Sequence, residues 1–103
     1  MSNDSLDSKW SLEVRERDHH KCRLWIVFND CSIQATQAHH LFTRNYKALR
    51  HNVDNGISVC WSCHNKIENH SQFLEIYQKV VSRDILEKLV KLLAIEGKFV
   101  KLD

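Results

Sequence analysis

The sequence predicts a small α+β protein in which cysteine and histidine side chains carry the chemistry. Short apolar segments that suit strands occur in the first two thirds of the chain, and two apolar stripes at helical spacing follow them. Four cysteines and seven histidines are many for 103 residues, whereas 2 glycines and no proline offer few turn signals. A metal site would hold the loops together in place of turn chemistry.

The amino-terminal part predicts one short helix after a polar segment. Residues 1–7 are polar and are expected to be disordered. From Ser8, the side chains of Trp10, Leu12 and Val14 lie among charged residues, which favours a short helix.

Three short segments then predict strands. Residues 24–28 are apolar and rich in β-branched and aromatic side chains, which suits a strand or a buried extended segment. Residues 32–40 suit a second short strand that leads to a histidine pair. Residues 57–59 alternate and suit a third strand that ends at Cys60, and residues 63–70 look like the start of a helix.

The carboxyl-terminal third predicts two helices that pack on the core. Apolar residues recur at helical spacing over residues 73–81 and again over 85–93. Ser82 suits the amino-terminal cap of the second helix, and Gly97 suits its end. The expected organisation is therefore a core over residues 8–81 and a helical extension over 82–103.

Composition sets wide limits on function. A formal net charge of +2 permits nucleic-acid binding without arguing for it. No stretch approaches the roughly 18–20 apolar residues of a membrane span, so no membrane partner is expected. Because the first residues lack the apolar region of a signal peptide, we expect a cytoplasmic protein.

The four cysteines predict a structural zinc site. Cys60 and Cys63 form a C-x2-C knuckle, and one tight turn can present both sulfurs to a tetrahedral zinc ion. Cys22 and Cys31 are separated by eight residues, wider than the usual gap, and a hairpin over residues 23–30 would bring their sulfurs together. A disulfide or four unrelated buried thiols are the alternatives.

A histidine pair, an asparagine and a histidine follow one another at fixed spacing around this knuckle. Asn55 lies fifteen residues after His40, and His64 lies nine residues after Asn55 and directly after Cys63. The segment AHHLFTRNYKALRHNVDNGISVCWSCHNKIE resembles the HNH endonucleases, and the resemblance covers roughly residues 15–80. It implies a small ββα-metal core of the HNH or His-Me finger type, with the helical extension after it.

The resemblance also implies a role for each residue of the pattern. His39 and His64 would bind a catalytic divalent cation, and His40 would be the general base. Asn55 would hydrogen-bond across the loop and fix the orientation of the base. Family members often carry a histidine four residues after the last one, and here Glu68 stands at that position as a tentative ligand. The wide gap between the first two cysteines also departs from members with two C-x2-C knuckles.

The implied reaction is hydrolysis of DNA phosphodiester bonds, which leaves 5′-phosphate and 3′-hydroxyl ends. Histidine has a reference pKa of about 6.5, which suits a base near neutral pH. A divalent cation, Mg²⁺ first and Mn²⁺, Ni²⁺, Co²⁺ or Zn²⁺ as alternatives, would neutralise the leaving oxygen. Adjacent residues on a strand point to opposite sides, so His39 and His40 would need a bend or bulge to serve one site.

A basic stretch between the histidine pair and the asparagine predicts contacts with the DNA backbone. Arg44, Lys47 and Arg50 are spaced by three and would share one side of a helix. They would bind phosphates without reading sequence, so low sequence specificity is expected. A solvated basic loop is the alternative.

Two other functions stay open at this point. The chain can be a zinc-ribbon DNA-binding module without catalysis, or a cysteine–histidine scaffold that binds another protein. Free-standing chains that resemble HNH endonucleases are common in phage and bacterial genomes, which is the origin expected here. The sequence does not predict the oligomeric state.

Overall fold

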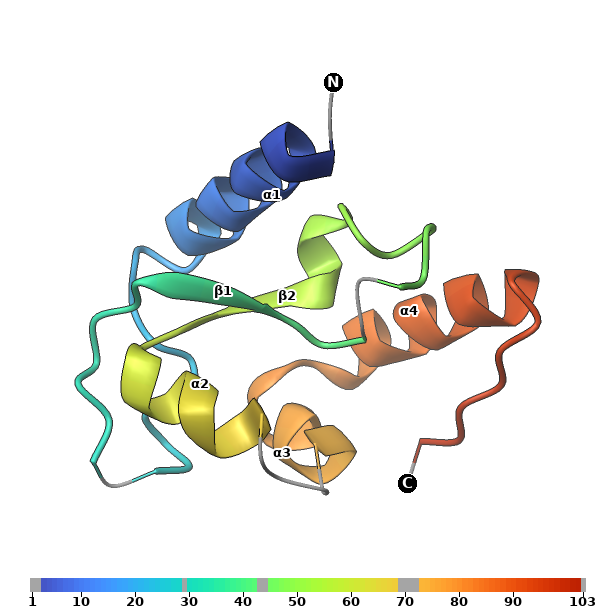
Figure 1. Ribbon diagram of the computed structural model, residues 1–103. Helices are drawn as coiled ribbons and strands as arrows, with labels where there is room; N and C mark the ends of the chain where they lie inside the picture. The colour runs from blue at the N-terminus through green and yellow to red at the C-terminus, as the bar shows by residue number, and fades with distance from the viewer. Residues whose placement is uncertain (1–2, 29, 43–44, 69–72, 103) are drawn as a thin grey trace.

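The structure is a computed structural model that describes residues 3–28, 30–42, 45–68 and 73–102. It contains one small sheet and several helices, which confirms the predicted α+β class (Figure 1). In chain order the elements are α1 (Asn3–Arg17), β1 (Gln37–His40), η1 (Val53–Asn55, a single 3₁₀ turn), β2 (Gly56–Val59), α2 (Trp61–Glu68), α3 (Phe73–Val80) and α4 (Arg83–Ile95).

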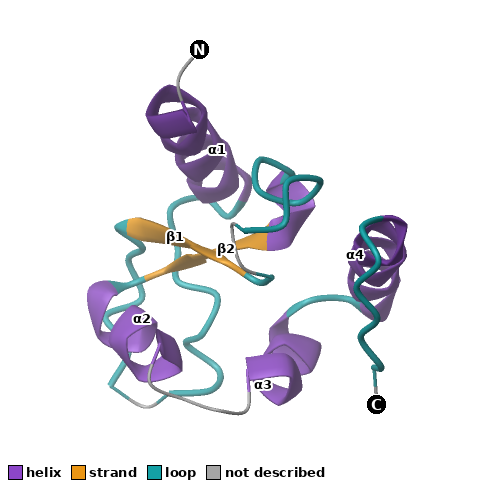
Figure 2. Cartoon of the chain, turned by 45° about the vertical axis from the view of Figure 1, so that its right-hand side comes forward, coloured by secondary structure: helices purple, strands orange, loops and turns teal. Residues whose placement is uncertain are grey.

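The sheet lies at the centre and consists of two antiparallel strands. Gln37 pairs with Val59 at one end of β1, and His40 pairs with Gly56 at the other end, with no bulge between them. Helix α1 lies on one side of the sheet, and α2 and α3 lie on the other side (Figures 1 and 2). All four residues of β2 are buried because helices cover the strand on both sides.

Helix α1 begins at Asn3, earlier than the sequence predicts. Residues 3–7, which we expected to be disordered, belong to this helix. The physical reason is a tertiary contact: the carboxylate of Asp7 binds Arg50 from the loop that precedes η1. Further along the helix, Trp10 and Val14 are buried against the sheet.

Gly56 lets α1 approach the sheet closely. A Cβ atom at this position would lie 2.6 Å from Cζ2 of Trp10 and 2.7 Å from Cγ2 of Val14. Both distances are shorter than real side-chain contacts allow, so only a residue without a side chain fits here. Glycine at position 56 therefore allows α1 to pack this closely on β2.

The expected strand over residues 24–28 is wrong. These residues form turns in which the amides of Val27 and Phe28 donate to the carbonyl oxygen of Leu24. Only Leu24 is fully buried, whereas the side chains of Trp25 and Ile26 are 61% and 54% exposed. The chain reverses here because the cysteines that flank the segment meet at one place, which leaves no room for an extended strand.

The two carboxyl-terminal helices agree with the sequence prediction. The hydroxyl of Ser82 accepts a hydrogen bond from the amide of Ile85 and so caps α4. Gly97 ends this helix with a left-handed φ of 79°. Leu86, Leu89 and Leu93 on α4 are fully buried in the same core as the sheet.

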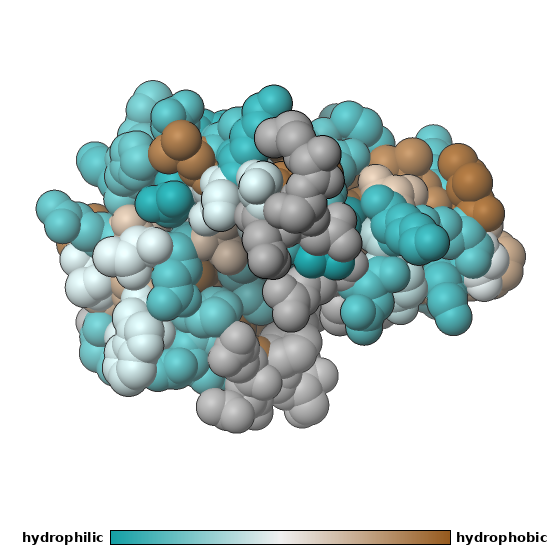
Figure 3. Space-filling view, turned by 45° about the horizontal axis from the view of Figure 1, so that its top comes forward, coloured by the Kyte–Doolittle hydropathy of each residue, from teal (hydrophilic) through white to brown (hydrophobic). Residues whose placement is uncertain are grey.

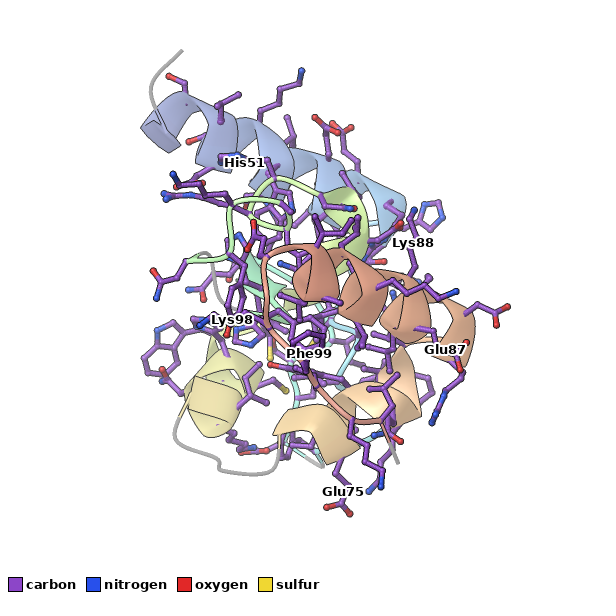
Figure 4. All side chains as sticks on the ribbon, turned by 90° about the vertical axis from the view of Figure 1, so that its right-hand side faces the viewer. His51, Glu75, Glu87, Lys88, Lys98 and Phe99 are labelled. Carbon is purple, nitrogen blue, oxygen red and sulfur yellow. The ribbon has the colours of Figure 1, made fainter. Side chains whose placement is uncertain are left out.

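Polar contacts also tie α4 to the middle of the chain. The amine of Lys88 lies 2.7 Å from the carboxylate of Asp54 in η1. Glu96, just after α4, accepts a hydrogen bond from the amide of Ala48 at 2.7 Å. Figure 4 shows Lys88 on the side of α4 that faces η1. The middle of α4 and the residue after its last turn therefore contact the segment that connects β1 to β2.

Hydrophilic side chains cover most of the described surface in the view of Figure 3. In the face shown in Figure 3, hydrophobic atoms gather chiefly at the end of the molecule formed by α4. Ile95 at the end of α4 is among the exposed apolar side chains. Within the described ranges, every helix is too short or too polar to cross a lipid bilayer.

Candidate metal centres and histidine cluster

Four cysteine sulfurs gather at one side of the sheet. The Sγ atoms of Cys22, Cys31, Cys60 and Cys63 all lie within 4.8 Å of one another. In a tetrahedral site with zinc–sulfur bonds of about 2.3 Å, neighbouring sulfurs are about 3.8 Å apart. The distance between the sulfurs of Cys31 and Cys60 is 3.8 Å, so this donor set fits a structural zinc ion.

The local backbone explains how the sulfurs converge. Cys60 follows β2 directly and Cys63 lies in the first turn of α2, where its amide points at the sulfur of Cys60 at 3.4 Å. The amide of Ile33 points at the sulfur of Cys31 at 3.3 Å. Amides aimed at sulfur in this way stabilise thiolates, which are the form that binds zinc.

The expected hairpin over residues 23–30 exists only at its base. Lys21 and Gln34 form an isolated bridge, and the amide of Cys22 donates to the carbonyl oxygen of Ile33. All four cysteines are free thiols, and a sulfur separation of 3.8 Å is almost twice a disulfide bond. The geometry therefore favours a metal site over a disulfide or scattered thiols.

The thiols of the cluster differ in their acidity. Burial opposes the ionisation of Cys60, but hydrogen bonds from the Cys63 amide and from Ser32 outweigh it and lower its pKa to about 6. Burial raises the pKa of Cys22 to about 11. Burial and the neighbouring sulfurs raise the pKa of Cys63 further. The thiol of Cys60 therefore ionises readily near neutral pH, and those of Cys22 and Cys63 ionise most readily when a cation compensates their charge.

A second group of side chains lies beside α2 and α3. The imidazole rings of His39 and His64 are 5.2 Å apart between centroids and meet edge to face. Nε2 of His39 lies 2.7 Å from the hydroxyl of Tyr77, which is buried in α3. Burial, followed by the charges of His64 and His40, lowers the pKa of His39 to about 3. The ring is therefore neutral at physiological pH, as a metal ligand must be.

His40 faces the other side of the sheet. Its ring stacks on the indole of Trp10 with centroids 3.8 Å apart and planes inclined by 5°. Its Nε2 lies 2.9 Å from the backbone carbonyl oxygen of Arg50. His39 and His40 thus point to opposite faces of a regular strand, and the bend or bulge that we considered is not present.

Asn55 closes the loop between the two strands. Its Oδ1 accepts from the amide of Phe42, and its Nδ2 donates to the carbonyl oxygens of Phe42 and Leu49. The side chain is fully buried. These bonds join the end of β1 to the turn that carries the carbonyl of Arg50.

The remaining sequence-predicted residues have different positions. Arg44 and the side chain of Glu68 lie outside the described residues. Lys47 is exposed on the loop after β1. Arg50 forms a bidentate ion pair with Asp7, at 3.0 and 2.7 Å. Its guanidinium is therefore engaged within the protein, whereas the side chain of Lys47 is exposed.

Two residues of the site escaped the sequence analysis. Tyr77 was only one member of an apolar stripe, and Trp10 was only one apolar residue of the first helix. Each contacts a histidine at least thirty residues away in the chain, which spacing alone does not reveal. The one available signal is that a buried tyrosine or tryptophan needs a partner for its polar atom.

Comparisons with known proteins leave the chain unassigned. No family model, no curated protein and no solved structure matches it.

Proposed function

We propose that this chain is a metal-dependent endonuclease of the HNH type that hydrolyses DNA. The observation that carries the proposal is the contact of His39 from β1 with His64 from α2, directly after the last cysteine of a cluster of four sulfurs. His40, the proposed base, lies on the opposite face of β1. The order and spacing of these histidines resemble the HNH pattern. In this proposal, β1, β2 and α2 would form the ββα-metal core.

The hydrogen bond of His40 supports its role as general base. The carbonyl oxygen of Arg50 can only accept, so the bonded Nε2 carries the proton. In the neutral ring, Nδ1 then carries the lone pair and is the atom that would take a proton from water. A histidine held in one tautomer by a backbone carbonyl is the arrangement that general-base catalysis requires.

The pair of His39 and His64 supports the cation site. The two rings meet edge to face, and a divalent cation bound there would stabilise the charge on the leaving 3′ oxygen. Glu68 in α2 would follow His64 by one helical turn and is a further ligand candidate. Imidazole donors accept Mn²⁺, Co²⁺, Ni²⁺ and Zn²⁺ as well as Mg²⁺.

The other parts of the site would position the substrate. The exposed Lys47, and Arg44 in the same stretch, would contact backbone phosphates, which gives affinity without sequence reading. The sulfur cluster, with zinc bound, would fix the start of α2 and therefore His64. Asn55 would hold the loop that supplies the carbonyl of Arg50 to the base.

Nicking of supercoiled plasmid by the pure protein, with Mg²⁺ or Mn²⁺ and with a chelator, tests the proposal. His40→Ala should remove the metal-dependent cleavage because no base remains to activate water, whereas DNA binding and the fold persist. A loss of at least about 100-fold is expected for a general base.

A matched control is His19→Asn. His19 is exposed and has a φ of 56°, a conformation that asparagine tolerates, so this variant should nick at the wild-type rate. If the wild-type protein binds DNA but never cleaves it with any divalent ion, the chain is instead a zinc-containing binding module. Equal cleavage by the wild-type and His40→Ala proteins would overturn the assignment of the base.

A further inference from the structure

The imidazole of His40 is held on its flat face by α1. The indole of Trp10 stacks on it with planes only 5° apart. The indole itself is fixed, because its Nε1 donates to the carbonyl oxygen of Asn52 at 2.8 Å and its ring packs against Gly56. Rotation of the imidazole out of this plane would break the stack.

The edge of the same ring is held through a second contact with α1. The acceptor for Nε2 of His40 is the carbonyl oxygen of Arg50. The guanidinium of Arg50 is bound by both carboxylate oxygens of Asp7. Nε2 of His51 lies 2.7 Å from the same carboxylate, and Figure 4 shows His51 next to α1. Asp7 therefore anchors the two consecutive residues whose backbone presents the acceptor.

Histidine needs such restraints because the rotation of its ring about χ2 is broad and has no sharp minimum. A ring turned by half a revolution would exchange its nitrogens, and the proton would then sit on the wrong side for catalysis. A flat neighbour fixes the plane of the ring, and a hydrogen-bond acceptor at its edge fixes the direction. Trp10 supplies the first restraint directly, and Asp7 supports the second.

We infer that α1 is the positioning element of the general base, with Trp10 and Asp7 as positioning residues. The inference rests on the proposed nuclease function for its catalytic meaning. Neither residue would touch the substrate or the cation. Both would keep His40 in the Nε2–H tautomer, in which Nδ1 is the nitrogen that can accept a proton.

Variants at Trp10 separate the flat stack from simple filling of space. Trp10→Leu keeps an apolar side chain without an aromatic plane, and Trp10→Phe keeps a plane without the N–H donor. In steady-state plasmid nicking by zinc-loaded full-length protein, Trp10→Leu should lower kcat about 10- to 100-fold, as expected for a misplaced catalytic group. KM should change little, and Trp10→Phe should retain most of the wild-type kcat. Trp25→Leu, the same substitution at an exposed tryptophan, is the matched control.

The tautomer of His40 supplies a readout that does not depend on cleavage. Long-range proton–nitrogen NMR correlations should show the Nε2–H form of His40 in the wild-type, Trp10→Phe and Trp25→Leu proteins. Trp10→Leu should show a mixture of both tautomers. If Trp10→Leu does not fold, Asp7→Asn takes its place, since Asp7 is partly exposed, and it should cause the same kind of change to a smaller degree.

The nicking kinetics and the NMR measurement together distinguish the failure of this inference from the failure of the proposed function. A wild-type protein that does not cleave, combined with the tautomer change in Trp10→Leu, would refute the nuclease and leave α1 as the element that orients His40. A folded Trp10→Leu protein with an unchanged tautomer would overturn the inference. A loss of activity in Trp25→Leu equal to that in Trp10→Leu would also overturn it.

Discussion

The histidine pair shows how much a single step along a strand decides. His39 and His40 are adjacent, yet one contacts Tyr77 and His64 and the other contacts Trp10 and the backbone of Arg50. The strand alternates its side chains between two faces, so neighbours in sequence receive different partners. The difference in surroundings separates a ligand candidate from a base candidate.

Tyr77 is expected to orient His39 toward a cation. With Nε2 of His39 bonded to the phenol, Nδ1 is the nitrogen that would bind metal. Burial raises the pKa of Tyr77, so the phenol stays neutral at physiological pH. Tyr77→Phe should weaken Mn²⁺ binding about 10- to 100-fold, the usual effect of removing a hydrogen-bond partner of a ligand. Calorimetric titration of the zinc-loaded protein measures the change.

The zinc content of Tyr77→Phe should equal that of the wild-type protein, because the four candidate zinc ligands are cysteine sulfurs. Tighter Mn²⁺ binding in this variant would mean that Nε2, released from the phenol, is the ligand atom.

At the scale of elements, Asp18 joins α1 to the sheet. Its carboxylate, whose side chain is only 4% exposed, accepts from both Arg17 and Arg23 and from the amide of Ser58 in β2. Arg17 in turn donates to the carbonyl oxygens of Val53 and Gly56. This network fixes the end of α1 where β2 begins, which also fixes the distance between Trp10 and the sheet.

Asp18→Asn should destabilise the fold and alter its response to acid. Burial opposes the ionisation of Asp18, but the hydrogen bonds and charges of its partners lower its pKa below the usual value. The carboxylate therefore adds stability above its unfolded pKa of about 3.9, and this contribution is lost as pH falls toward the lower folded value. We expect a loss of about 1.5–3 kcal/mol at pH 7, as for hydrogen bonds to charged groups.

Urea unfolding of the wild-type and Asp18→Asn proteins measures this difference. The difference should be the same at pH 7 and pH 5 and should shrink below about pH 4. An Asp18→Asn protein as stable as the wild type at pH 7 would show that the network adds nothing to stability.

The elements differ in how well their sequence predicted them. Helix α4 carries its own cap at Ser82, a full apolar stripe and an ending glycine, so local signals suffice. Residues 24–28 have the composition of a strand, but the convergence of Cys22 and Cys31 forces the chain to turn. Local propensity yields there to a contact between residues far apart in sequence.

At the scale of the whole molecule, the sulfur cluster connects segments that lie far apart in the sequence. Cys22 follows α1, Cys31 lies in the loop before β1, and the other two cysteines connect β2 to α2. Structural zinc contributes about 10–16 kcal/mol in small modules, comparable with the stability of about 5–15 kcal/mol of an entire domain. Loss of the ion should therefore unfold the protein.

Elemental analysis should find about one zinc per chain in the purified protein. A strong chelator should abolish the cooperative unfolding transition followed by circular dichroism, and added zinc should restore it. Cys63→Ser should behave like the chelated protein. A protein that contains no zinc and unfolds cooperatively would contradict the structural role of the cluster.

The sequence by itself determined which side chains make up the candidate site. The C-x2-C knuckle, the histidine pair, the asparagine and the last histidine are encoded at short, fixed spacings, and periodicity encodes the carboxyl-terminal helices. Such features are local, because they depend on a few bonds of chain and on side-chain type.

Only the tertiary structure decided which groups orient the candidate catalytic and metal-binding histidines. The stack of Trp10 on His40, the phenol of Tyr77 on His39 and the ion pair of Asp7 with Arg50 all join distant segments. No local pattern specifies such contacts, since they follow from how α1 and α3 pack on the two sides of the sheet. Gly56 contributes to this packing because it allows α1 to approach β2 closely.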